Sequence, residues 1–139
     1  MKSKKFLIIY ICWIAFIWIN SSIPAEGSSQ ISGGLSYELY RFLHLNIDFE
    51  LFHSLIRKCA HFTEYTILGI LACLSVKKER RFSMIAGCIL VACLDETLQL
   101  FVPGRSGEIR DVLIDASGVI FGMGIYLLCE KIKHNKSVI

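Results

Sequence analysis

Apolar stretches of near-membrane length, separated by polar segments, dominate this chain. Spanning a bilayer takes about 20 residues, and four of the stretches approach that length. They predict helices at about 6–23, 57–76, 83–102 and 111–130. We therefore expect an all-α integral membrane four-helix bundle, formed by a single domain over residues 1–139.

The first apolar stretch permits a second interpretation. Three lysines precede it and "IPAE" follows it, as in a secretory signal peptide. However, Trp13 and Trp18 are bulky for the core of such a peptide, and Ile23 is a poor residue three positions before a cleavage point. We therefore favour a retained membrane helix.

The connection between the first two stretches divides into two parts. It begins with "SSIPAEGSSQISGG", a composition that predicts a flexible segment. Leu35, Leu39 and Leu43 then recur at helical spacing in "LSYELYRFLHL". This pattern predicts a short amphipathic helix on the outer membrane surface. Asp48 follows, at a position where it can cap the next helix.

Basic residues are divided unequally between the two sides of this arrangement. Ten of the 15 Lys and Arg residues lie at the two termini and between the second and third helices, and five lie on the other side. Because the side richer in Lys and Arg faces the cytoplasm in membrane proteins, both termini are predicted to be cytoplasmic. The first and third connections then face outward, and the protein is multi-pass.

The composition supports a membrane protein. Hydrophobic residues make up 54% of the chain and charged residues only 19%, whereas soluble proteins are nearer 25% charged. The six cysteines lie mostly in apolar stretches and form no CxxC pair, so we interpret them as packing residues. Since topology explains the basic residues, no nucleic-acid partner is expected.

The second predicted span carries polar side chains along one face. At 100° per residue, five positions share an arc of about 120°. Polar groups in lipid are costly, so this face is expected to meet water or other polar groups inside the protein. The five residues are Arg57, Lys58, His61, Glu64 and Tyr65.

The third predicted span repeats this pattern in "CLDETLQLFVPGR". Asp95 and Gln99 lie on one side of the helix, with Glu96 next to them. If the helix continues to Val102, Asp95 lies too deep for its carboxylate to face lipid. We expect it to face the bundle or a wet cavity.

The fourth predicted span has a single stripe that changes character along the helix. Asp111 and Asp115 form its outer, acidic part. Gly118 and Gly122 form its inner part, a GxxxG pattern suited to close helix contact and to a homo-oligomer.

These three faces together predict a polar pocket that opens to the outer side of the membrane. Three alternatives remain open: basic side chains that reach lipid headgroups, acidic residues that serve only to start a helix, and an internal salt-bridge network that only fixes packing. The predicted lining comprises Arg57, Lys58, His61, Glu64, Asp95, Glu96, Gln99, Arg105, Asp111 and Asp115.

These motifs, taken in order, resemble the VanZ-like family of small bacterial membrane proteins, named for an association with teicoplanin resistance. The resemblance implies a bacterial cell membrane protein and covers nearly the whole chain. One departure is Asp115, where the family more often has Asn. The matching residues are Lys58, His61, Phe62, Glu64, Tyr65 and Gly69, then Asp95, Glu96 and Gln99, then Pro103, Gly104 and Arg105, then Asp111 and Val112.

Two functions fit the predicted pocket, and the residues alone leave open whether the protein is an enzyme. One is an enzyme acting on a lipid-linked cell-wall precursor or a phospholipid headgroup. Its phosphate would be held by Lys58 and Arg105, with Tyr65, Gln99, Asp111 and Asp115 as further ligand-binding residues. The acid–base groups would be His61, Glu64, Asp95 and Glu96.

The other function is a non-catalytic protein that binds such a lipid or helps to assemble the envelope, and a minimal transporter is a less favoured third. A divalent metal cofactor is also compatible with the residue types, since His and carboxylates suit zinc or manganese. The His-x-x-Glu and Asp-Glu spacings are weak signals for it.

Overall fold

The computed structural model describes residues 4–44, 46–105 and 107–136, and within them the chain is all-α, as predicted, with no strand. Five α-helices and one 3-10 turn make up this part of the chain. They are α1 (Lys4–Ser21), α2 (Ala25–Leu43), α3 (Phe49–Ser75), η1 (Lys78–Arg80), α4 (Arg81–Gln99) and α5 (Ile109–Lys136).

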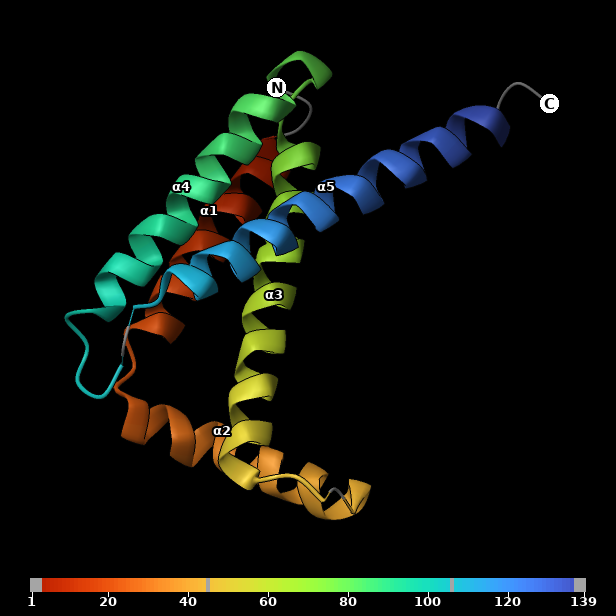
Figure 1. Cartoon of the computed structure of the whole chain (residues 1–139). Coiled ribbons are helices and arrows are strands. Elements are labelled where there is room, and N and C mark those ends of the chain that lie inside the picture. Colours follow the sequence, from red (N-terminus) through yellow and green to blue (C-terminus); the bar gives the residue numbers. More distant parts are fainter. Residues whose placement is uncertain (1–3, 45, 106, 137–139) are drawn as a thin grey trace.

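The helices α1, α3 and α4 run alongside one another, and α5 crosses α3 (Figure 1). The start of α1, the turn at η1 and the end of α5 lie toward one end of the molecule, whereas α2 lies across the other end. The core between the helices includes Tyr65, Leu68 and Val119, all fully buried. This arrangement brings the C-terminal end of α4 next to the N-terminal end of α5.

The helices α3 and α5 make the most extensive contact in the described chain, and glycines permit it. A Cβ atom at Gly122 would collide with the backbone carbonyl of Thr66, and one at Gly118 with that of Phe62. Across the same interface, a Cβ atom at Gly69 would collide with the carbonyl of Val119. Helix α3 of the same chain therefore packs against the predicted GxxxG seam. A homo-oligomer formed through this seam stays a prediction.

Three helices are long and apolar enough to cross a membrane: Lys4–Ser21, Lys78–Gln99 and Ile109–Lys136. Helix α3 has 27 residues, but the segment predicted to span the membrane is interrupted by Lys58, His61 and Glu64. Large hydrophobic side chains are exposed along the three apolar helices, as expected for surfaces in contact with lipid.

Two sequence expectations about helix boundaries were wrong. Residues 25–34 of the segment expected to be flexible belong to α2, which starts directly after Pro24 and runs for 19 residues. Proline is compatible with a helix start because its fixed φ suits the first turn and its missing N–H is not needed there. Helix α4 ends at Gln99 and not at Val102, because the chain turns before Pro103.

The cap of α3 was predicted correctly, although the predicted span at about 57–76 began eight residues after the observed start at Phe49. Asp48 is the N-cap, and its side chain accepts a hydrogen bond of 3.1 Å from the backbone N–H of Leu51. The cap satisfies one of the free N–H groups of the first turn. It sets the start of the helix that carries the polar face of the pocket.

A partly buried ion pair joins α4 and α5 at the opposite end from the pocket. Arg81 is 2% exposed and donates two hydrogen bonds, of 2.8 and 2.7 Å, to the carboxylate of Glu130. Its guanidinium also lies over the ring of Tyr126. The sequence places Arg81 among the topology-setting basic residues, whereas in the fold it links two helices.

Candidate functional site

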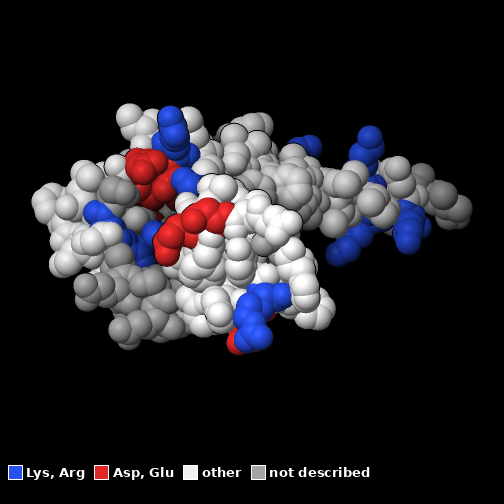
Figure 2. Space-filling view, turned by 60° about the horizontal axis from the view of Figure 1, so that its bottom comes forward, with Lys and Arg blue, Asp and Glu red and all other residues white. Residues whose placement is uncertain are grey.

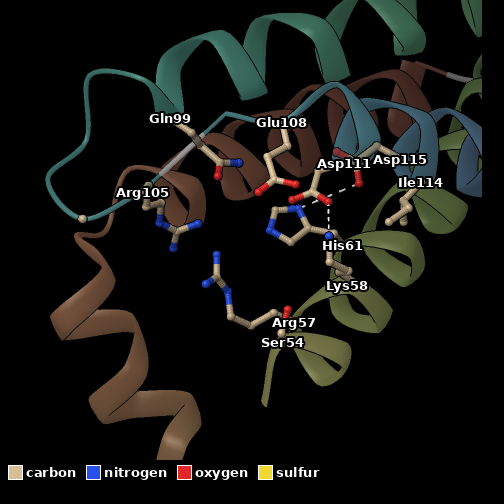
Figure 3. A pocket seen from close by; sticks show the side chains of 11 residues that line it. Ser54, Arg57, Lys58, His61, Gln99, Arg105, Glu108, Asp111, Ile114 and Asp115 are labelled. Atoms are coloured by element: carbon tan, nitrogen blue, oxygen red, sulfur yellow. Dashed lines mark hydrogen bonds and ion pairs between the residues drawn. The ribbon is translucent and has the colours of Figure 1, made fainter. Parts of the chain in front are cut away.

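A polar cavity of about 200 Å³ lies where α3, the end of α4 and the start of α5 meet (Figure 3). Basic and acidic side chains gather side by side around this end of the molecule (Figure 2). Seven of the ten predicted lining residues line the cavity. The full lining is Ser54, Arg57, Lys58, His61, Gln99, Gly104, Arg105, Glu108, Asp111, Ile114 and Asp115.

Two arginines reach into the cavity from different elements. Arg57 extends from α3 toward Arg105, which follows the turn after α4 (Figure 3). Gly104 makes that turn with a φ of 75°, a conformation that glycine adopts without steric cost. The turn directs Arg105 back over the cavity.

The Arg105 guanidinium is anchored by backbone carbonyls and not by a carboxylate. It donates hydrogen bonds of 2.9 Å to the carbonyl of Ile23 and 3.4 Å to that of Asn20. Burial lowers the pKa of Arg105 from its ordinary value, and the positive charge of Arg57 lowers it further. Among the described residues, Arg57 makes no hydrogen bond or ion pair. Neither guanidinium group therefore has a carboxylate partner among the described residues, although Glu108, Asp111 and Asp115 line the same cavity.

Lys58 differs from these arginines because it already has a partner. It forms an ion pair with Asp111 across the α3–α5 interface. Of the two residues expected to hold phosphate, Arg105 is available to a ligand, whereas Lys58 is already engaged with Asp111. Arg57 is the other basic group in the cavity wall that has no carboxylate partner among the described residues.

Three predicted site carboxylates lie behind the cavity wall, where each accepts a hydrogen bond. Glu64 accepts one of 3.0 Å from the side chain of Asn20. Asp95 accepts one of 2.8 Å from Ser21. Glu96 accepts 3.0 Å bonds from the Gln99 side chain and from the backbone N–H of Glu108. These bonds tie α1 and the α4–α5 connection to the site.

A set of buried polar atoms between α3, α4 and α5 has no hydrogen-bond partner in the part of the chain that the structure describes. It includes Nδ1 of His61, the hydroxyl of Tyr65, Oδ1 of Asp95 and both carboxylate oxygens of Asp115. Tyr65, Asp95 and Asp115 are each 0% exposed. One ligand atom each from His61, Asp95 and Asp115 lies within 4.8 Å of the other two. Tyr65, predicted as a ligand-binding residue, lies inside this set and not on the cavity wall.

Several residues that contact the site were given no site role from the sequence, and three of them are polar groups at the ends of helices or beside one. Asn20 and Ser21 end α1 and bond Glu64 and Asp95, and Glu108 lines the cavity. Two polar residues at the end of an apolar helix can indicate a role in a polar site, but their hydrogen-bond partners lie 44 and 74 positions away in the sequence. Such pairing depends on tertiary packing.

These features define a class: a small all-helical membrane protein with a charged pocket at one end of its helices. The VanZ/LLP1 family model matches residues 6–130, and the chain belongs to this family. It is also similar to the uncharacterized membrane protein YwnJ of Bacillus subtilis (strain 168), with 30% identity over 129 residues, which is 88% of this chain and 90% of that protein. No solved structure matches the chain.

Proposed function

We propose that the pocket binds the phosphate-bearing headgroup of a membrane lipid or of a lipid-linked cell-wall precursor. The observation that carries this proposal is the pair of arginines, Arg57 and Arg105, which face one cavity without a carboxylate partner. Arginine suits phosphate because its planar group donates two parallel hydrogen bonds to two oxygens. A bound phosphate would also relieve the repulsion between the two guanidinium groups.

The proposal places the pocket at the outer surface of the bacterial cell membrane. It requires α3 to serve as a fourth span, with its polar face turned toward the other helices, in a four-helix bundle. Both termini would then be cytoplasmic, which agrees with their position near one end of the molecule (Figure 1) and with the Lys and Arg distribution. A lipid could approach the pocket laterally and leave its chains in the bilayer.

Lipid binding to the purified protein tests the proposal. Native mass spectrometry can compare phosphatidylglycerol, undecaprenyl phosphate and free inorganic phosphate. Arg57→Ala and Arg105→Ala should each weaken binding of the preferred lipid by about tenfold or more, since one charge-assisted hydrogen bond contributes about 1.5–3 kcal/mol. Arg110→Ala is the matched control, because Arg110 is exposed on α5 and does not line the cavity.

The three ligands distinguish the sources of the phosphate. Preference for undecaprenyl phosphate supports a cell-wall precursor, and preference for phosphatidylglycerol supports a phospholipid. Equal binding by the wild type and both pocket variants would contradict the proposal.

A catalytic role is the second candidate. It is favoured by His61 and Asp115, which line the cavity and hold polar atoms without hydrogen bonds. Under this candidate, His61→Ala or Glu96→Gln abolishes turnover of the bound lipid while its affinity is retained. Under the binding function alone, loss of function follows loss of affinity.

Family membership also motivates a link to teicoplanin and related lipoglycopeptides, which we include in the proposal. Deleting the gene should then raise susceptibility to teicoplanin, and Arg105→Ala should fail to restore resistance. Unchanged teicoplanin susceptibility after deletion would contradict this link. The lipid-binding proposal would then be tested by the binding measurements alone.

A further inference from the structure

The unpartnered atoms between α3, α4 and α5 converge on one point. His61 lies on α3, Asp95 on α4 and Asp115 on α5, and their nearest ligand atoms all fall within 4.8 Å of one another. Nδ1 of His61 lies 3.9 Å from Oδ1 of Asp115. Three separate helices thus contribute one nitrogen and two carboxylates to the same small volume.

The two carboxylates are fully buried, yet no Lys or Arg among the described residues bonds either of them. Of the three basic residues that line the cavity, Lys58 pairs with Asp111, Arg105 bonds backbone carbonyls, and Arg57 makes no hydrogen bond or ion pair among the described residues. Burying charge without compensation is costly. A dication would neutralise both carboxylates while leaving His61 neutral.

Neighbouring groups orient Asp95 toward this point. Its Oδ2 accepts hydrogen bonds from Ser21 at 2.8 Å and Gln99 at 3.5 Å, while Oδ1 stays without a partner. Hydrogen bonding of one carboxylate oxygen to a second layer of side chains is the usual support for a ligand that uses its other oxygen on a metal. The Tyr65 hydroxyl, also unpartnered, adds a polar group next to the set.

We propose that His61, Asp95 and Asp115 bind one divalent transition-metal ion, Zn²⁺ or Mn²⁺. One imidazole and two carboxylates suit both ions. Ligand atoms around a tetrahedral zinc ion stand about 3.4 Å apart, so the three side chains must draw together by about one ångström. Three protein ligands leave at least one coordination position for water or a ligand oxygen.

His61 and Asp115 also line the cavity, so the open position would face it. The proposed metal site does not depend on the headgroup function. The His-x-x-Glu spacing points to Glu64 as a ligand, but Glu64 is not among the three residues whose ligand atoms lie within 4.8 Å of one another. Asp115, which lies on α5, takes that place.

Metal binding by the full chain tests this assignment. Protein in detergent is treated with EDTA, dialysed and titrated with Zn²⁺ or Mn²⁺, and bound metal is counted by mass spectrometry of the eluted ions. The wild type should bind one ion. His61→Ala, Asp95→Asn and Asp115→Asn should each weaken binding by at least about 100-fold, since loss of even a supporting residue costs 10–100-fold.

Asp111→Asn is the matched control. Asp111 lies one turn before Asp115 on the same face of α5 and lines the same cavity, but it pairs with Lys58. This variant should keep one bound ion. If a variant at Asp95 fails to fold, His61→Ala decides the result, because His61 is partly exposed at the cavity wall.

The proposal is overturned if the wild type binds neither ion, or if the three ligand variants bind like the wild type. Phosphate-lipid binding is measured separately on EDTA-treated protein with Arg57→Ala. If the wild type binds lipid but no metal, the metal site is wrong. If it binds metal but no lipid, the headgroup site is wrong.

Discussion

Arg105 depends on its neighbour Gly104 to reach the pocket. Gly104 has a φ of 75°, in a region where a residue with a Cβ atom is strained by about 1–2 kcal/mol. Replacing Gly104 is therefore expected to change the position of the Arg105 side chain without removing that side chain.

We expect Gly104→Ala to lower the free energy of unfolding by about 1 kcal/mol. It should also weaken phosphate-lipid binding in the direction of Arg105→Ala, because the Arg105 guanidinium loses its position. Denaturant titration in detergent and native mass spectrometry measure the two effects. Gly87→Ala is the control, since Gly87 lies in α4 with open space at its Cβ position; a Gly104 variant that behaves like it would contradict the account.

At the residue scale, the sequence identified most of the charged groups but not their pairing. Helical spacing places His61 and Glu64 on one face, yet His61 lines the cavity whereas Glu64 bonds Asn20 on α1. Spacing along one helix determines direction, but which neighbouring helix supplies a partner depends on the packing of the whole chain.

The α3–α5 pair is held by reciprocal close contact between the two backbones. Glycine at 118 and 122 on α5 meets carbonyl groups of α3, and Gly69 on α3 meets one of α5. Any side chain at these positions would force the helices apart, and the pocket residues on both helices would move with them.

We expect Gly122→Ala to destabilise the protein by about 1–3 kcal/mol through overpacking against Thr66. Gly124→Ala should leave stability equal or raise it by up to about 1 kcal/mol, because Gly124 has open space around it and Ala favours helix. Denaturant titration of the two variants compares roughly opposite faces of one helical turn. Equal loss of stability in both would show that this close contact is absent.

The Arg81–Glu130 pair links α4 and α5 at the other end of the bundle. Glu130→Ala should destabilise the protein by about 1–3 kcal/mol, since it leaves the buried Arg81 guanidinium without its carboxylate. Glu79→Ala, at an exposed position on η1, should change stability little. Thermal unfolding in detergent compares them, and equal effects would contradict a structural role for the pair.

At the element scale, the apolar pattern located the helices, and the Asp48 cap was predicted from its position before an apolar run. Helix α2 was underestimated because Ser and Gly have low helix propensity. The GxxxG pattern of Gly118 and Gly122 is visible in the sequence, but the sequence does not show that α3 packs against it.

For the whole molecule, the distribution of basic residues predicts which end faces the cytoplasm. Single cysteines in a background with all six natural cysteines replaced can report this in intact cells. We expect Glu108→Cys to react with a membrane-impermeant thiol reagent, whereas Glu79→Cys and Lys133→Cys react only after lysis. Labelling of Glu79→Cys in intact cells would show that the predicted topology is reversed and that the pocket faces the cytoplasm.

The central claim is that an anionic headgroup lies between Arg57 and Arg105. The most direct measurement is a high-resolution map of the protein purified with its native lipid, supported by mass spectrometry of that lipid. The account predicts phosphate density within hydrogen-bonding distance of both guanidinium groups. A well-resolved cavity with no bound phosphate, and with both arginines paired to the protein's own carboxylates, would contradict it.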